Sequence, residues 1–578
     1  MPDRSLRYLY PIDSEEHRYL LVDRYEFLVY RRLWQALEAG HVFCRDSQRF
    51  RRLDDDLISA ERWAKDKAEL IAQVGLSHLQ TPVKELLTSL KQELEGQLRR
   101  VNERILSGEN SHVRVKKRGQ HTTWTLPYPR SEEGINDPFF NEVEQIDIQA
   151  LMHFVHQKSG FLDVFEHILP RYAKQSAEEQ VILACLVAWG TNMGLRRLGA
   201  ISDIDFQTLT AASDNFLRLE TLKPANDLVT NAIAELPIFR YYDLDEQVHS
   251  SSDGQKFETL IHTLNARHSS KYFGLKKGIV VITLVANHIP VNADIIGANE
   301  HESHSVFDLV YNNVSDVQPT VHSTDTHGAN QVNFAILNFF DKQFAPRYKD
   351  IRGKVQTSLY GFQHPSQYPQ EWLLKPIRKL NEDLVIREWD TIQRIIVSLA
   401  LKTTTQSIII SKLSSHARRN DTRQALWEYD NILASLYLLK YIDSPPMRRG
   451  VQQALNQGES YHHLHRAVSY ANFGKLRFKT EYDQHLWSEC SRLIANCIIF
   501  YNASIVSALL LRNQEKGDED PAALLRHISP VAWPHINFYG RFKFAGIPVL
   551  IDIASIVQAI IARAMPPEPD VSPHNPKF

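Results

Sequence analysis

Cysteine is scarce in this sequence, and an export signal is missing. The 578 residues include only four widely spaced cysteines and no CxxC pair; the cysteines are Cys44, Cys185, Cys490 and Cys497. So few scattered thiols do not form a disulfide framework. The first 20 residues contain no apolar stretch of the signal-peptide type. The sequence therefore predicts a protein of the reducing cytoplasm.

Long hydrophobic runs are also nearly absent. One stretch, residues 544–565, has the length needed to cross a membrane. It contains Pro548, Asp552, Gln558 and Arg563, and such residues are costly in a lipid bilayer. The stretch is therefore predicted to form a helix buried in the protein, and no membrane partner is expected.

The sequence also lacks an excess of charge of either sign. Lys and Arg number 66 and Asp and Glu number 68, which gives a formal charge of −2. This balance excludes a histone-like protein that binds nucleic acid through its overall charge, but it permits a local basic groove. With 43% hydrophobic residues the chain can bury large cores, and its length predicts three or more domains.

Helical spacing dominates the first 238 residues. The clearest case spans 83–105, where apolar residues recur every three or four positions after Thr81 and Pro82. Its short seam favours a helix packed in a bundle over a dimerising coiled coil, which stays the alternative. We expect a helical linker or dimerisation region over 1–145, with a solvated basic loop at 114–120 and a linker at 120–145, and a helical scaffold over 146–238.

β-rich runs appear between residues 239 and 350. Two of them meet around ANHIP, residues 286–290, and predict a hairpin. A strand at 318–324 is followed by a glycine and a helix, which makes a strand–turn–helix unit. A hairpin followed by strand, helix and strand is the order expected of a mixed sheet of the ribonuclease-H type.

Three acidic residues stand in settings that suit metal-dependent chemistry. Asp253 in SSSDGQ and Asp325 in STDTHG each end a β-run close to a glycine, and Glu459 in NQGESYHH lies near the start of a helix. Strand ends beside glycine are where open sheets place functional side chains. Converging carboxylates bind Mg²⁺, and a pair of such ions can activate a water or a 3′-hydroxyl at a phosphodiester. Taken singly, each aspartate before glycine is more often a turn residue.

Histidines offer a competing interpretation as zinc ligands. They occur in two short motifs, HESH and YHHLHR, at His301, His304, His462, His463 and His465. HESH is not the HExxH helix motif, and no cysteine lies nearby. His462 and Arg466 instead share a helical face with Glu459, an arrangement that suits a scissile phosphate. A polar helix face in water is the plain alternative.

Positive charge gathers in residues 411–479, which hold 11 Lys and Arg against 5 acids. A second basic and aromatic stretch, with Lys271, follows Asp253. Such clusters bind phosphate backbones, although solvated helix faces have the same composition. We expect a positive surface that leads to the three acids, with arginines at Arg418, Arg419, Arg448, Arg449 and Arg466.

Several motifs resemble the catalytic region of Tn3 family transposases. The most specific are SSSDGQKF, HSTDTHG followed by FFDKQFAPRYKDI, and LYLLKYIDSPPMRRGVQQALNQGESYHHLHRAV. Four further motifs fit the family in the same order: FLVYRRLWQALEAGHVFCRDSQRFR, WGTNMGLRRLG, CIIFYNASI and LRHISPVAWPHINFYGRFKF. The resemblance therefore covers roughly residues 20–543.

The resemblance implies a replicative transposase with a DDE triad. The triad corresponds to Asp253, Asp325 and Glu459, which would also hold Mg²⁺, with Mn²⁺ as a substitute. We expect contacts to DNA phosphates from His462, Arg466, Arg448, Arg449 and Lys271. Tyr461 stands where the family often has a basic residue, and Asn502, His535 and Asn537 match the family without an assigned role.

The fold class that follows is multidomain and mostly α-helical, with a ribonuclease-H-like α/β catalytic core interrupted by a helical insertion. We expect the core at 239–350 and 451–510, the insertion at 351–450, and a C-terminal region with a disordered tail at 511–578. The implied activity is nicking of DNA at transposon 3′ ends and strand transfer into target DNA. The implied partners are transposon-end DNA, target DNA and a second copy of the chain, in the bacterial cytoplasm at the nucleoid.

One departure from the family is length. Its members are typically much longer and carry DNA-binding domains for the transposon ends in their N-terminal half. We therefore expect a truncated, split or decayed copy. Two other functions stay open: an inactive remnant that only oligomerises or binds DNA non-specifically, and a stand-alone metal-dependent nuclease.

Overall fold

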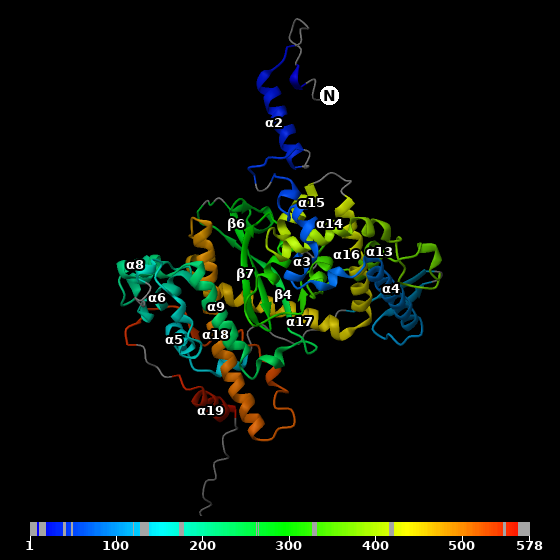
Figure 1. Cartoon of the computed structure of the whole chain (residues 1–578). Helices are drawn as coiled ribbons and strands as arrows, with labels where there is room; N and C mark the ends of the chain where they lie inside the picture. The colour runs from blue at the N-terminus through cyan, green and yellow to red at the C-terminus, as the bar shows by residue number, and fades with distance from the viewer. Residues whose placement is uncertain are drawn as a thin grey trace, which may run out of the picture. The chain divides into compact units, whose positions relative to one another are not determined.

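The computed structural model (Figure 1) describes the chain except for residues 1–7, 11–18, 39–41, 48–49, 119–120, 128–137, 173–177, 262, 264, 326–331, 416–420, 547–550 and 565–578. Two compact units are distinguished. The first comprises Met1–Thr125, Asn330–Asp341 and Asp350–Asp443; the second comprises Leu126–Ala329, Lys342–Lys349 and Ser444–Phe578. Each unit is thus assembled from segments that are far apart in the sequence.

The first unit is a helical bundle. Its helices are α2 (Val22–Glu38), α3 (Ala60–Gln73), α4 (Val83–Leu106), α12 (Asn333–Phe339), α13 (Ile351–Ser358), α14 (Glu382–Ala400), α15 (Gln406–Ser415) and α16 (Asp421–Asp443). α4 packs on α14 and α16, and Leu94 and Leu98 on its inner face are fully buried. The expected bundle packing of this helix is therefore present.

A small hairpin in the first unit corrects the prediction for residues 114–125. β1 (Arg114–Arg118) pairs antiparallel with β2 (His121–Thr125), so this stretch is a hairpin and neither a loop nor a linker. Trp124 is buried, and Thr122 and Thr123 are β-branched residues that favour strands. The buried tryptophan supplies the apolar contact that a basic loop would lack.

The second unit is built on a mixed sheet. Its strands are β4 (His249–Glu258), β5 (Arg267–His268), β6 (Lys277–Ala286), β7 (Ile289–Gly297), β8 (Val321–Ser323) and β9 (Gln343–Phe344). β6 pairs antiparallel with β4, β5 and β7, whereas β8 pairs parallel with β4 and with β9. The order is β7–β6–β4–β8–β9, with β5 beside one end of β6. β4 is thus the central strand at which the antiparallel part meets the parallel part.

The predicted hairpin is confirmed at β6 and β7. Asn287 and His288 form its two-residue turn and have φ angles of 46° and 72°. Positive φ at both central residues is the requirement of a type I′ turn, whose twist matches that of the strands. The strand predicted at 318–324 is also confirmed, as the shorter β8.

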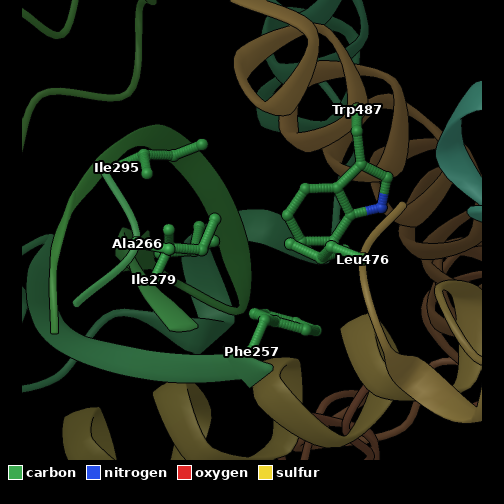
Figure 2. Packing of buried hydrophobic residues seen from close by; sticks show 7 residues of the cluster. Phe257, Ala266, Ile279, Ile295, Leu476 and Trp487 are labelled. Atoms are coloured by element: carbon green, nitrogen blue, oxygen red, sulfur yellow. The ribbon is translucent and has the colours of Figure 1, made fainter. Parts of the chain in front are cut away.

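The second unit also contains helices, some of which contact this sheet. They are α5 (Ile148–Ser159), α6 (Glu179–Gly190), α7 (Leu195–Ile201), α8 (Phe206–Phe216), α9 (Leu219–Ala234), α10 (Ser270–Phe273), α11 (Val306–Tyr311), α17 (Pro445–Val468), α18 (Glu481–Glu515) and α19 (Ile553–Ala564); a two-stranded ladder of β3 (Ile146–Asp147) and β10 (Ile536–Asn537) lies apart. Figure 2 shows Trp487 of α18 packed against Phe257, Ile279 and Ile295 of the sheet. The Phe257 and Trp487 rings meet edge to face at 4.9 Å.

The apolar helices do not follow the prediction exactly. Among the described helices only α18 is long and apolar enough to cross a membrane, and 89% of its most apolar window is buried in the protein. In the stretch 544–565, α19 buries only Val557 and Ile560, so this helix is amphipathic rather than buried. The four cysteines are free thiols, as expected. The tail predicted to be disordered lies outside the described residues.

Candidate active site

One face of β4 carries the residues that meet helix α17. Because side chains alternate along a strand, Ser251, Asp253, Gln255 and Phe257 share that face. Ser251 donates a hydrogen bond to the Ala454 carbonyl at 2.6 Å, and the Gln255 amide donates to the His462 carbonyl at 2.8 Å. Further along, Gln255 bonds the His465 ring at 2.7 Å. These contacts fix the position of α17 along β4.

Asp253 lies within β4 and not at the end of a β-run, which corrects the prediction. It pairs with Thr283 of β6, and the strand continues to Glu258. The parallel pairing with β8 ends earlier, at Ser251 and Ser323, so the edge facing β8 is open beside Asp253. Gly254 does not mark a turn here. A Cβ on Gly254 would lie 2.2 Å from Glu302 Oε1 and 2.6 Å from Val280 Cγ1, so glycine is needed for close packing.

Asp325 follows the end of β8, as predicted. The register of β8 against β4 is held by a buried histidine. His322 hydrogen-bonds Ser250 at 2.9 Å through Nδ1 and Ser252 at 3.0 Å through Nε2. Burial lowers the pKa of His322 to about 3, so the ring is neutral and can both donate and accept. This ladder brings the end of β8 next to Asp253.

Glu459 lies in the second half of α17, and the prediction that it is near a helix start is wrong. The helix begins at Pro445, where the Ser444 side chain caps it by accepting a hydrogen bond from the Met447 N–H and two prolines follow the cap. The buried stripe of α17 includes Val451, Ala454 and Tyr461. Glu459 projects to one side of this stripe, with half of its side chain exposed.

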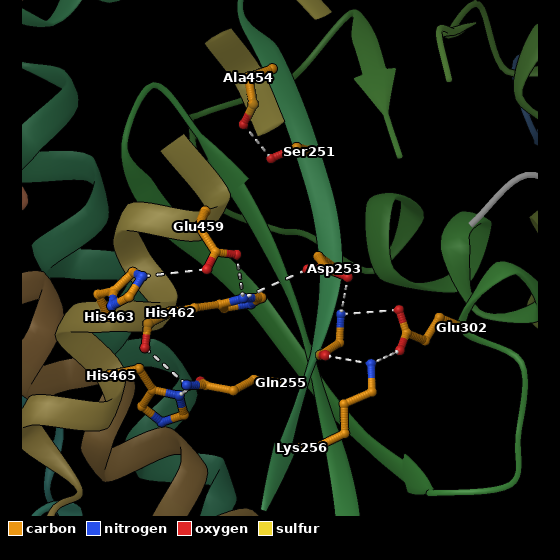
Figure 3. Close-up of polar contacts among 11 residues, drawn as sticks. Ser251, Asp253, Gln255, Lys256, Glu302, Ala454, Glu459, His462, His463 and His465 are labelled. Atoms are coloured by element: carbon orange, nitrogen blue, oxygen red, sulfur yellow. Dashed lines mark hydrogen bonds and ion pairs between the residues drawn. The ribbon is translucent and has the colours of Figure 1, made fainter. Parts of the chain in front are cut away.

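Three side chains converge at the site, as Figure 3 shows. Ligand atoms of Asp253, Glu459 and His462 all lie within 4.8 Å of one another. His462 Nδ1 is 3.7 Å from Asp253 Oδ2 and 4.0 Å from Glu459 Oε2. Burial, together with the smaller effects of the positive charges on Arg466 and Lys256, lowers the pKa of His462 to about 3. His462 is therefore neutral and offers a lone pair.

A fourth carboxylate, which sequence reasoning missed, borders Asp253. Glu302 accepts a hydrogen bond from the Gly254 N–H at 3.1 Å and pairs with Lys256 Nζ at 2.6 Å (Figure 3). The pKa of Asp253 is raised to about 7, first by burial and then by the negative charges of Glu302 and, more weakly, Asp325. The site is therefore short of positive charge. Glu302 lies in the HESH motif, whose histidines were considered as zinc ligands and whose glutamate was not considered.

Removing the charge of Glu302 tests this electrostatic reading. In Glu302→Gln the pKa of Asp253 should fall below about 7, because a neighbouring negative charge is lost and Lys256 is freed. The measurement is a carbon-13 NMR titration of aspartate-labelled chain, with Asp253→Asn to assign the signal. Glu300→Gln, an exposed neighbour, should leave the titration unchanged. An unmoved pKa in Glu302→Gln would contradict the assignment.

The zinc interpretation of HESH gains no support. His301 and His304 lie 5.5 Å apart between ring centroids. In the described part of the chain, neither belongs to a group of three or more residues that could hold a metal ion. His463 instead pairs with Glu459, at 3.4 Å.

The expected phosphate-binding residues fall into two groups. Arg449, Arg466 and Lys271 are exposed, and Lys271 Nζ lies 4.9 Å from the Tyr272 ring. Arg448 is buried, because it continues the inner stripe of α17 one turn before Val451, so it is not part of an outer surface. In the first unit, Lys412 of the basic segment is buried in an ion pair with Asp56. Arg418 and Arg419 lie outside the described residues.

The remaining family positions have structural roles. Tyr461 is buried and stacks on His465 at 5.5 Å. Asn502 of α18 donates to the carbonyls of Pro530 and Ala532 and bonds the His535 ring. Asn537 donates to Asp147 and so ties the β3–β10 ladder. None of these contacts involves Asp253 or Glu459.

Comparison with known proteins identifies the family to which the chain belongs. Residues 150–542, more than half of the chain, match the family described as the Tn3 transposase DDE domain. The chain therefore belongs to the Tn3 transposase family. It is 27% identical over 526 residues to the transposase of transposon Tn2501 from Escherichia coli, covering 90% of this chain and 52% of that protein.

Two more relatives show the same coverage. The transposase of Tn1546 from Enterococcus faecium is 25% identical over 90% of this chain and 51% of its own length. The transposase of transposon gamma-delta from Escherichia coli K12 is 25% identical over 92% of this chain and 54% of its own length. The chain thus spans about half the length of these curated relatives.

Proposed function

We propose that the chain carries the chemical centre of a DNA transposase, which cuts DNA at transposon 3′ ends and joins the 3′-hydroxyl to target DNA. The observation that carries this proposal is the meeting of Asp253 on the central strand with Glu459 on α17, within 4.8 Å of His462. The charge of Asp325 reaches the same place, since it contributes to the raised pKa of Asp253.

The donor set fits divalent cations. Two carboxylates with a third nearby are the oxygen ligands that Mg²⁺ and Mn²⁺ prefer. The raised pKa of Asp253 supports the fit, because crowded negative charge is relieved when a cation binds. Asp253, Asp325 and Glu459 would hold the ions, with the neutral His462 beside them. When bound, such ions activate a water or hydroxyl and stabilise the leaving oxygen at a phosphodiester.

The protein's own groups would orient and shield this centre. The hydrogen bonds of Ser251 and Gln255 to α17 hold Glu459 at a fixed distance from Asp253. The Glu302–Lys256 pair holds the backbone at Gly254, directly after Asp253. Exposed Arg466, one turn beyond His462 on the same helix, would contact the DNA backbone together with Arg449 and Lys271.

The strand order supports a ribonuclease-H-like core. Three antiparallel strands followed by two parallel ones, in the order β7–β6–β4–β8–β9, match that architecture. We propose that residues 239–350 and 451–510 form this core and that 351–450 are inserted between Asp325 and Glu459. Transposon-end DNA, target DNA and a second copy of the chain are the proposed partners, at the bacterial nucleoid.

A nicking assay tests the proposal and separates it from its rivals. Labelled duplexes with the transposon's terminal repeats, and scrambled duplexes, are incubated with Mg²⁺, with Mn²⁺ or with EDTA. Cutting of the end duplex that needs a divalent ion supports the transposase. Equal cutting of both duplexes favours a stand-alone nuclease, and binding without any cutting favours an inactive remnant. Cutting that persists in EDTA contradicts the metal-dependent mechanism.

A further inference from the structure

A second candidate site lies along the part of α17 that precedes Glu459. A cleft of about 190 Å³ is lined by the α17 residues Arg449, Gln453 and Gln457, by the segment 241–245, by His288 and by residues 526–527. All of these belong to the second unit. Ser250 pairs with Ala286 beside the His288 turn, three residues before Asp253. His288 is five residues beyond Thr283, the partner of Asp253, so it lies roughly 15 Å along the sheet from the proposed catalytic centre.

The floor of the cleft carries an unsatisfied acceptor. Gln457 is 4% exposed, and its amide nitrogen lies 3.4 Å from His288 Nε2. Its Oε1 has no hydrogen-bond partner among the described residues. A buried amide oxygen without a partner is costly, and such atoms in native structures call for an explanation. Asp243, which accepts a bond from Asn287 at 2.6 Å, adds further acceptor capacity to the wall.

The rim of the cleft carries cationic side chains, in contrast to the acceptor atoms described above. Arg449, Arg526 and His527 are exposed around the cleft. Arg526 is paired with Asp520, whereas Arg449 has no ion pair with any described residue. A rim of cations over a floor of acceptors fits a ligand that has an anionic part outside and hydrogen-bond donors inside. Tyr241 and the buried Tyr242 supply aromatic walls.

Two tight turns of the backbone border the cleft. Asp245 and Glu246 have φ angles of 53° and 60°, and Asn287 and His288 have 46° and 72°. Glycine would occupy these left-handed positions without penalty. Two of the four residues, Asp245 and His288, line the cleft. The angles are those of the two-residue turns that close the Leu244–Gln247 bridge and the β6–β7 hairpin.

We propose that this cleft binds one nucleotide of DNA, turned out of the duplex beside the scissile phosphate. The inference rests on the proposed function, since it takes DNA as the substrate. The volume is below the roughly 300–1,000 Å³ of sites for drug-sized molecules, so one base fits better than a whole cofactor. The base lies against the tyrosines, and its 5′ or 3′ phosphate meets Arg449.

The acceptors on the floor define which base is favoured. Gln457 Oε1 and Asp243 require a donor, which cytosine provides through its exocyclic amino group and uracil does not at the same position. Cytosine and uracil are otherwise matched in size and charge. Hexamers of deoxycytidine and deoxyuridine are therefore a matched pair of probes. In single strands the bases are already free of a partner, so no cost of unpairing enters.

The experiment measures the affinity of the whole chain for the two labelled hexamers by fluorescence anisotropy in EDTA. We expect deoxycytidine to bind about tenfold more tightly than deoxyuridine. Gln457→Met should bring this ratio close to one, and Arg449→Ala should weaken both hexamers equally. The exposed arginine of α7, in Arg197→Ala, is the charge-matched control and should change neither. Thermal melting of each variant checks folding.

A second variant covers the case in which Gln457→Met does not fold. Asp243→Asn exchanges one acceptor oxygen for a donor and should also lower the preference for deoxycytidine. Equal affinity of the wild-type chain for both hexamers, or a preference that survives both variants, overturns the proposal. The assay needs no metal and no cutting. A preference for deoxycytidine without nicking activity would therefore support nucleotide binding in the cleft and contradict the proposed function. Nicking activity without a base preference would support the proposed function and contradict nucleotide binding in the cleft.

Discussion

Asp253→Asn is expected to reduce metal-dependent nicking on the order of a thousandfold or more, the scale seen when one member of a catalytic group that acts as a unit is removed. Asn keeps the size and one oxygen of the side chain but loses the charge. The pKa of Asp253 is raised to about 7, first by burial and then by the negative charges of Glu302 and Asp325. The binding of a cation should therefore depend strongly on the negative charge of Asp253. Rates of nicking at saturating Mg²⁺ and Mn²⁺ are the measurement.

The nicking rates of three further variants are compared with that of Asp253→Asn. Asp325→Asn and Glu459→Gln should lose activity to a similar extent, because a shared metal pair fails when any ligand is lost. Asp518→Asn, an exposed aspartate beyond α18 in the same unit, should cut at the wild-type rate. Activity in Asp253→Asn within about tenfold of wild type would rule out this residue as a metal ligand.

Glu489→Ala should destabilise the second unit by about 3–5 kcal/mol, because it leaves Arg492 charged and buried without its partner. The two side chains are 4% and 2% exposed and lie 2.5 Å apart on α18. Arg492 also donates to the carbonyls of Pro290 and Val291 at the start of β7. The pair therefore joins α18 to the sheet. Hydrogen exchange of the α18 and β7 amides measures the local free energy of opening.

Two further variants identify the cause. Glu515→Ala, at the exposed end of α18, should change stability by less than about 0.5 kcal/mol. Replacing both partners, as Glu489→Leu with Arg492→Met, should recover much of the loss, since no buried charge then remains. An equal loss in the single and double variants would mean that packing, and not the unpaired charge, is responsible.

Local patterns in the sequence predicted the local structure well. The ANHIP turn, the strand before Asp325 and the apolar spacing of residues 83–105 each depend on neighbours in the chain, and each is present. The proximity of Asp253 and Glu459 followed from family resemblance, because no local signal joins residues so far apart. Their catalytic role stays a prediction.

Two of the wrong predictions involve partners that are distant in sequence. Asp253 was placed at a strand end because Gly254 follows it, whereas the close neighbour that explains Gly254, Glu302, comes 48 residues later. Lys412 was counted in the basic segment 411–479, although it is buried against Asp56, 356 residues away. Arg448 could have been placed from the sequence. Val451 and Ala454 already set the inner face of that helix, and Arg448 falls one turn earlier on it.

The contact between β4 and α17 also determines when, during synthesis of the chain, the proposed catalytic centre can form. Ser251 and Ala454 are separated by 203 residues, and translation adds about 5–20 residues per second. Roughly 10–40 s of synthesis therefore pass between the two halves of the proposed catalytic centre. During that interval a nascent chain holds Asp253 without Glu459 and cannot form the carboxylate pair. Under the proposed function, a growing polypeptide near the genes that encode it cannot cut DNA until α17 has left the ribosome.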